Sequence, residues 1–170
     1  MKGRSRKISV CAILSALTLS ALYIGSVFPT GRVGLIAASS LFGIAAVIEV
    51  GMSGGAFVYV ASALLGALIV PDKSAVIFYA LFFGYYPVLK SFAETGKNRV
   101  TEWLIKLFAM NAALTVTVFV FSGLVFDIGS LPFGTPILYA VVNAAFVLFD
   151  IGVTKLIGYY ITRISKNIGK

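Results

Sequence analysis

Hydrophobic positions in this chain are grouped into six long runs separated by short polar or glycine-rich segments. The runs predict membrane-spanning helices at 8–28, 33–50, 56–70, 75–89, 107–126 and 136–160. About 20 apolar residues at ~1.5 Å per residue are enough to cross ~30 Å of hydrocarbon. The pattern therefore predicts an all-α polytopic membrane protein, with six transmembrane helices in one bundle and a single integral membrane domain over 1–170.

Basic residues gather at three places between and beside these runs. The three groups are Lys2, Arg4, Arg6 and Lys7; Lys90, Lys97, Arg99 and Lys106; and Lys155, Arg163, Lys166 and Lys170. Six crossings would place all three groups on one side of the membrane, and the positive-inside rule makes that side cytoplasmic. We therefore expect both termini in the cytoplasm, Arg32 and Lys73 outside, and a multi-pass location in the cell (plasma) membrane.

Composition supports the membrane class. Hydrophobic residues make up 59% of the chain and charged residues 12%, with a mean hydropathy of +1.01, which is outside the range of ordinary soluble domains. The net charge of +8 then reflects membrane topology, and no nucleic-acid partner is expected. The first run is longer than the hydrophobic core of a signal peptide and has no clear cleavage site, so we expect an uncleaved helix.

Several kinds of chemistry are excluded by the residues that are missing. The chain has no histidine and one cysteine, Cys11, so disulfides, Cys–His or Ser–His pairs and the usual thiolate or imidazole metal sites cannot form. It also lacks the Walker A pattern of ATPases. We expect a protein that is not an enzyme and that needs no metal or cofactor of its own.

Two acidic residues lie inside predicted spans. Glu49 and Asp150 would each cost about 2.5–3.5 kcal/mol at a helix centre, so such residues ordinarily face protein or water. In one reading, Glu49 reaches water near the cytoplasmic turn or pairs with Lys106 or Lys155, and Asp150 pairs with Lys155. The other reading gives the two carboxylates a coupling or gating role.

Polar residues also form stripes at helical spacing on the last two spans. The sixth span carries Tyr139, Asn143, Asp150 and Thr154, and the fifth carries Asn111, Thr115 and Ser122. Such stripes predict either hydrogen bonds between helices or a wet interior. The outer ends of the helices then supply a candidate substrate pocket, built from Tyr23, Arg32, Tyr79, Tyr139 and Asn143. Arg32 taken alone is better explained as a solvated loop residue than as a ligand. Interfacial anchoring accounts equally well for several of the aromatic residues.

Small residues recur every four positions on two predicted helices. Ala12, Ala16 and Ser20 lie on the first, and Ser62 and Gly66 on the third. Such faces let helix backbones approach closely, either inside the bundle or against another subunit.

The basic leader running into 6–17, the Ala12 and Ala16 pair and the single small six-helix unit resemble the substrate-binding (S) components of energy-coupling-factor (ECF) vitamin transporters. The resemblance implies that a vitamin-like small molecule is captured from the external side. It implies that Ala12 and Ala16 contact a transmembrane coupling subunit. ATPases on separate chains would then drive release by toppling the S component within the membrane lipid.

Two other functions remain open. A membrane scaffold subunit of a cell-envelope complex would use the stripes as packing seams and bind no solute. A small ion-coupled secondary transporter would use Glu49 and Asp150 as its coupling carboxylates. Secondary transporters usually show inverted repeats and discontinuous helices, and no internal repeat is visible in this sequence.

Overall fold

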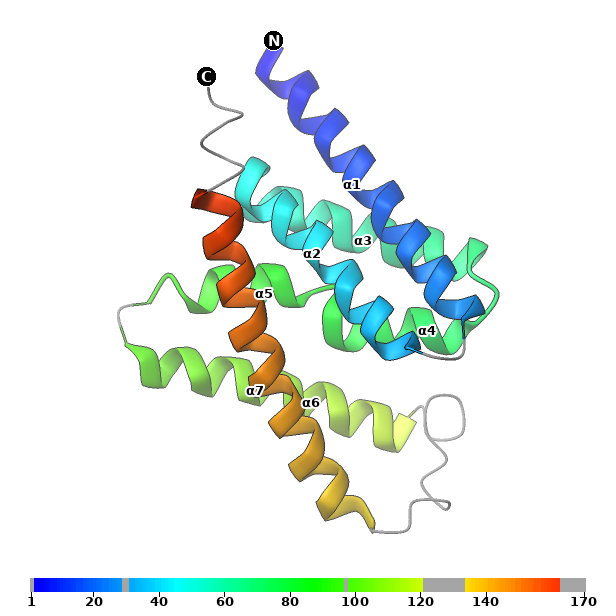
Figure 1. Cartoon of the computed structure of the whole chain (residues 1–170), viewed down its shortest axis with the longest axis vertical. Coiled ribbons are helices and arrows are strands. Elements are labelled where there is room, and N and C mark those ends of the chain that lie inside the picture. Colours follow the sequence, from blue (N-terminus) through cyan, green and yellow to red (C-terminus); the bar gives the residue numbers. More distant parts are fainter. Residues whose placement is uncertain (1, 29–30, 97, 121–133, 163–170) are drawn as a thin grey trace. The chain divides into compact units, whose positions relative to one another are not determined.

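The computed structural model describes residues 2–28, 31–96, 98–120 and 134–162, and every element within these ranges is a helix (Figure 1). The elements are α1 (Lys2–Val27), α2 (Arg32–Val50), α3 (Met52–Ile69), α4 (Lys73–Phe78), the π-helix η1 (Tyr79–Phe83), α5 (Tyr86–Ala93), α6 (Arg99–Val120) and α7 (Gly134–Tyr160). Six segments in the described ranges are long and apolar enough to cross a membrane, with Lys73–Ala93 counted as one. The predicted all-α class with six spanning helices is confirmed, and the side that each terminus faces stays a prediction.

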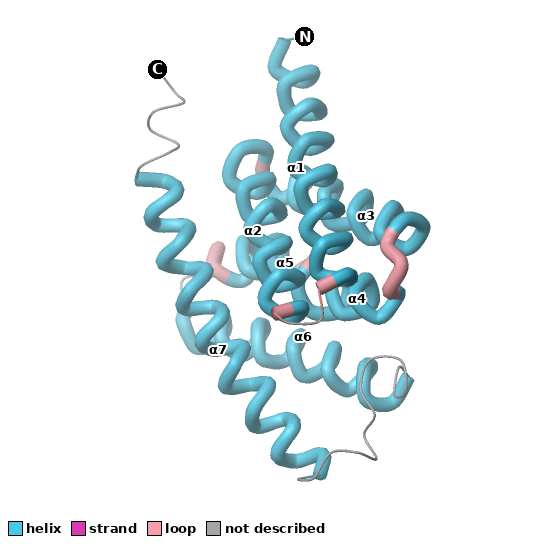
Figure 2. Tube along the Cα trace, turned by 45° about the vertical axis from the view of Figure 1, so that its right-hand side comes forward, coloured by secondary structure: helices cyan, strands magenta, loops and turns pink. Residues whose placement is uncertain are grey.

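The chain divides into two compact units. The first, Met1–Ile128, contains α1 to α6, and the second, Gly129–Lys170, contains α7. In the first unit α1, α2 and α3 pack against one another, and α5 packs against α2, α3 and α6. Figures 1 and 2 show α1 beside α2 and α3.

Two groups of buried side chains form the core of the first unit. The larger consists of Leu22, Ile36, Val70, Ala75, Val76 and Tyr79. The smaller consists of Cys11, Ala46 and Val58. The larger group joins α1, α2, α4, η1 and the end of α3, so it holds the connection from α3 to α4 against the first two helices.

The connection between α2 and α3 is shorter than the glycine-rich segment suggests. The sequence predicts a turn over 51–55, but only Gly51, with a φ of 100°, interrupts the two helices. Gly54 and Gly55 lie in the first turn of α3, where an added Cβ would come within 2.5 Å of Val50 Cβ and 2.3 Å of Val47 Cγ2. These two glycines therefore serve close packing of α3 on the end of α2.

The fourth span is interrupted inside the membrane segment. The backbone N–H of Gly84 donates to the carbonyl of Tyr79 at 2.7 Å, an i to i+5 bond that closes the π-helix. Helix α5 then starts afresh with Pro87 in its first turn, where a missing N–H is tolerated. The whole segment Lys73–Ala93 has 21 residues, so it is longer than the predicted span 75–89.

The fifth span also begins earlier than its apolar run. The mixed charges between positions 90 and 106 predict a cytoplasmic loop that leads into an interfacial helix start. In the structure, residues up to Ala93 belong to α5, and helix α6 already starts at Arg99. The predicted end of this span and Ser122 of its polar stripe lie outside the described residues, as do the basic residues from 163 onward.

Candidate functional site

The small-residue stripe of α1 faces away from the other helices of the first unit. Ala12, Ala16 and Ser20 are exposed, whereas Ser15 and Thr18 between them are buried. The hydroxyl of Ser20 donates to the Ala16 carbonyl at 2.9 Å, so its polar group is satisfied within the helix. The stripe is therefore not used for packing inside the first unit.

The small residues of α3, Ser62 and Gly66, face the interior of the first unit. Ser62 is fully buried, and its hydroxyl lies 3.5 Å from the Ser15 carbonyl of α1. Gly66 is also buried, and an added Cβ would meet the Val76 side chain at 3.5 Å. Here small residues allow helices of the same unit to approach, which is the internal role that the α1 stripe does not have.

Arg32 begins α2 and is held in a set of contacts that we call the Arg32 clasp, consisting of Arg32, Asp72 and Ser74. The guanidinium forms an ion pair with the Asp72 carboxylate and donates to the Ser74 hydroxyl. Asp72 is the N-cap of α4 and accepts hydrogen bonds from the Ser74 backbone N–H at 2.9 Å and from its hydroxyl at 2.6 Å. The predicted substrate residue Arg32 thus ties the start of α2 to the turn before α4.

The contacts of this turn lower the pKa of Asp72 and also engage Lys73. Burial alone would raise the pKa of Asp72, but the hydrogen bonds from Ser74 and the positive charge of Arg32 lower it further than burial raises it. Lys73 donates to the carbonyls of Ala67 and Val70 at 2.8 and 2.9 Å, at the C-terminal end of α3. Both predicted external cations are therefore engaged with protein groups.

The two tyrosines of the first unit that were predicted to bind substrate lie in different surroundings. Tyr23 of α1 is 46% exposed. Tyr79, the first residue of η1, is 1% exposed and belongs to the larger core group with Leu22 and Ile36. Tyr79 is therefore a core residue, and Tyr23 is available at the surface.

The remaining predicted pocket residues, Tyr139 and Asn143, lie on α7 in the second unit. The Asn143 side-chain amide donates to the Tyr139 carbonyl at 2.8 Å, and the Thr154 hydroxyl donates to the Asp150 carbonyl at the same distance. On α6 the Asn111 amide bonds the Leu107 carbonyl in the same way. Each of these side chains therefore donates a hydrogen bond to a carbonyl of its own helix.

Glu49, the other predicted intramembrane carboxylate, lies one residue before the end of α2.

A buried charge network lies at the α5–α6 end of the first unit. This lysine cluster consists of Lys90, Glu94, Glu102 and Lys106. One oxygen of Glu94 accepts from both lysines, at 2.8 Å from Lys106, and Glu102 accepts from Lys106 at 2.6 Å. Lys90 and Lys106 are 2% and 0% exposed. Lys106 also lies over the Trp103 ring at 5.7 Å.

The predicted cytoplasmic loop over 90–106 does not account for the burial of Lys90 and Lys106. A usable signal was present, because Lys90 and Glu94, and likewise Glu102 and Lys106, are spaced four residues apart.

An aromatic contact holds the break in the fourth span. An added Cβ on Gly84 would lie 2.5 Å from Tyr59 Cδ2 and 2.9 Å from Tyr79 Cε1. The Tyr59 hydroxyl donates to the Ala80 carbonyl at 3.2 Å. A carbonyl within the π-helix is thus satisfied by a side chain of α3.

Metal binding has no obvious location in the described ranges, where no group of three or more Cys, Asp and Glu side chains could hold an ion. Comparison with family models, curated proteins and solved structures found no match. The six apolar helices indicate a multi-pass membrane protein.

Proposed function

We propose that this chain is the solute-binding subunit of an ECF-type importer. It would capture a vitamin-like small molecule from the external side and pass it inward together with a coupling subunit and ATPases on separate chains. The observation that supports this best is the outward orientation of Ala12 and Ala16 on α1.

The exposed stripe has the chemistry of a helix-docking face. Small side chains allow the backbone of a partner helix to come close, and in a bilayer such packing, more than hydrophobicity, drives helix association. Larger apolar residues lie beside the stripe, with Ile13 61% and Leu17 43% exposed. A partner helix would therefore meet small side chains at Ala12 and Ala16, with exposed apolar side chains along one side of them.

The other end of the first unit fits a role in solute capture. The Arg32 clasp and the buried Tyr79 hold the turn between α3 and α4, at the end of the helices that the charge pattern places outside. Tyr23 offers an exposed aromatic ring near the end of α1. An aromatic ring and a few fixed polar groups are the usual means of binding a small flat solute.

Native mass spectrometry of protein purified from its own host in mild detergent tests both the docking through α1 and the capture of a solute. Wild-type protein should carry a stoichiometric small molecule and co-purify with a membrane subunit and a chain that has a Walker A motif. Ala16→Leu should lose these partner chains and keep the small molecule. Ala112→Leu is the matched control, because Ala112 is an exposed alanine of α6 outside the stripe.

Each result has a defined consequence. Loss of the partners in both variants, or in neither, would contradict docking through α1. Partners without any bound small molecule from cells supplied with vitamins would contradict solute capture and favour a scaffold.

A second candidate is a small ion-coupled secondary transporter, which the broken fourth span favours. Discontinuous helices expose backbone carbonyls that bind ions and substrates in such proteins. The π-helix and the missing N–H of Pro87 interrupt the regular hydrogen bonding of the fourth span, although the backbone there stays right-handed helical. Loss of ion-dependent uptake in Glu49→Gln or Asp150→Asn, with solute binding intact, would favour this candidate over the importer subunit.

A further inference from the structure

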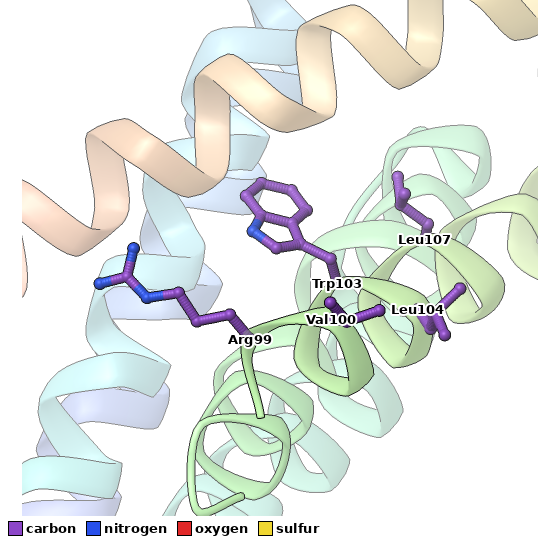
Figure 3. A pocket seen from close by; sticks show the side chains of 5 residues that line it. All are labelled: Arg99, Val100, Trp103, Leu104 and Leu107. Carbon is purple, nitrogen blue, oxygen red and sulfur yellow. The ribbon is translucent and has the colours of Figure 1, made fainter. Parts of the chain in front are cut away.

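A hollow on the surface of α6 begins at the first residue of the helix (Figure 3). It is lined by Arg99, Val100, Trp103, Leu104 and Leu107. Arg99 lies at one end of the row and Leu107 at the other, and the side chains between them are apolar or aromatic (Figure 3). The hollow thus combines one cationic end with a long apolar wall.

The positive charge of Arg99 is not compensated by the protein part that the structure describes. Its nearest acidic neighbours in the sequence, Glu94 and Glu102, accept hydrogen bonds from Lys90 and Lys106 instead. Arg99 is exposed, and its guanidinium has no ion pair or hydrogen bond among the described residues. The lysine cluster therefore leaves Arg99 open to an anion from outside.

The wall next to Arg99 suits a lipid tail. Val100 and Leu104 are 65% and 63% exposed, and the eight steps from Arg99 to Leu107 span about 12 Å of helix, the length of the upper part of an acyl chain. Trp103 lies between, and tryptophan favours the level of the lipid headgroups. A guanidinium binds a phosphate through paired hydrogen bonds.

We propose that this hollow binds one anionic phospholipid, with its phosphate on Arg99 and an acyl chain along Val100, Leu104 and Leu107. Phosphate alone would gain nothing from the apolar wall, and a zwitterionic lipid would bring no net charge to Arg99. The positive-inside pattern places Arg99 at the cytoplasmic leaflet, where anionic lipids attract basic residues. The proposal does not depend on the transport function.

Native mass spectrometry of the purified protein with added phosphatidylglycerol or phosphatidylcholine of the same chains tests this site. The wild type should retain phosphatidylglycerol preferentially. Arg99→Gln should lower that retention about fivefold, the effect expected for one basic residue near an anionic headgroup. Arg4→Gln removes the same charge from an exposed position of α1 and should leave retention unchanged.

A second variant separates a lipid site from a simple anion site. Leu104→Ser keeps every charge and changes an exposed side chain, and it should also weaken retention because the acyl chain loses its wall. Tryptophan fluorescence and the elution volume would report whether each variant is folded. The proposal is wrong if the Arg99 and Arg4 changes act equally, if the two lipids are retained equally, or if inorganic phosphate displaces the lipid while Leu104→Ser has no effect.

Discussion

The Arg32 clasp and the lysine cluster use the same kind of contact in very different surroundings. In the clasp, the Arg32 and Asp72 side chains are 34% and 31% exposed. In the cluster, Lys90 and Lys106 are 2% and 0% exposed. Water screens the first ion pair, so it contributes little to stability. The two buried lysines have lost their hydration, so each depends on the carboxylates that replace water.

The Arg32 clasp and the lysine cluster lie at opposite ends of the fourth span. Asp72 caps α4 at one end of the fourth span, and Lys90 and Glu94 lie on and beside α5 at the other. Ion pairs with similar contacts should therefore respond unequally to the same kind of substitution.

The largest effect is expected from Glu94→Gln. The change removes the carboxylate shared by Lys90 and Lys106, and we expect it to lower the free energy of unfolding by about 2–3 kcal/mol. That lies below or at the low end of the roughly 3–5 kcal/mol typical of a fully buried pair, because Glu94 itself is 37% exposed. Arg32→Gln is the matched change in the clasp and should cost about 0.5 kcal/mol. Unfolding in mixed detergent micelles measures both, and equal costs would remove the contrast between the clusters.

The next largest effect concerns the packing between the two clusters. Gly84→Ala would place a methyl group 2.5 Å from the Tyr59 ring, so one ring or the backbone has to move. Such overpacking costs about 1–3 kcal/mol, and we expect a value near 2. Gly34→Ala is the control, because its added methyl would meet nothing within 4 Å in α2. The control should be neutral or slightly stabilising, since alanine favours helix.

Both glycine variants would be compared by thermal unfolding in the same detergent. If Gly84→Ala were as stable as Gly34→Ala, the contact of Gly84 with the rings of Tyr59 and Tyr79 would be loosely packed.

A smaller effect is expected in the clasp when its helix cap is removed. Asp72→Ala loses both the ion pair with Arg32 and the hydrogen bonds from Ser74, and it should cost about 1 kcal/mol. Asp72→Asn keeps an oxygen that can cap α4 and loses only the charge, so it should cost about half as much. Thermal unfolding of the two variants separates cap from charge. An asparagine variant as unstable as the alanine variant would assign the whole effect to the ion pair.

The six helices could be predicted from the sequence because a bilayer leaves a spanning backbone few options. Every N–H and C=O in hydrocarbon has to be bonded within the segment, so a long apolar run is a helix. The interruption of the fourth span is different. Pro87 is a local signal for a change in the helix, but the π-helix before it is packed against Tyr59, which lies 25 positions from Gly84 in the sequence.

The candidate sites show the same division between local and tertiary information. The spacing of Ala12 and Ala16 was visible in the sequence, but which side of α1 packs on α2 and α3 was not. The burial of Lys90 and Lys106 could not be predicted from the sequence, because lysines are rarely buried. Their burial depends on Glu94, which belongs to neither α5 nor α6 and is brought between them by the turn.

The smallest expected effect is the pH dependence of the clasp, and it tests the claim that this pair is partly in water. The pKa of Asp72 lies below its ordinary value of 3.8, since the bonds from Ser74 and the charge of Arg32 outweigh burial. A carboxyl whose pKa is lowered on folding stabilises the folded state above its unfolded pKa and loses that contribution as the pH falls through the folded pKa. The stability difference between wild type and Asp72→Asn should therefore be constant from about pH 7 to 5 and shrink below about pH 4. Taking the difference cancels the other carboxyls, including those of the lysine cluster. A difference that stays constant down to pH 3 would mean that the charge of Asp72 contributes nothing, and that the clasp acts only through the cap of α4.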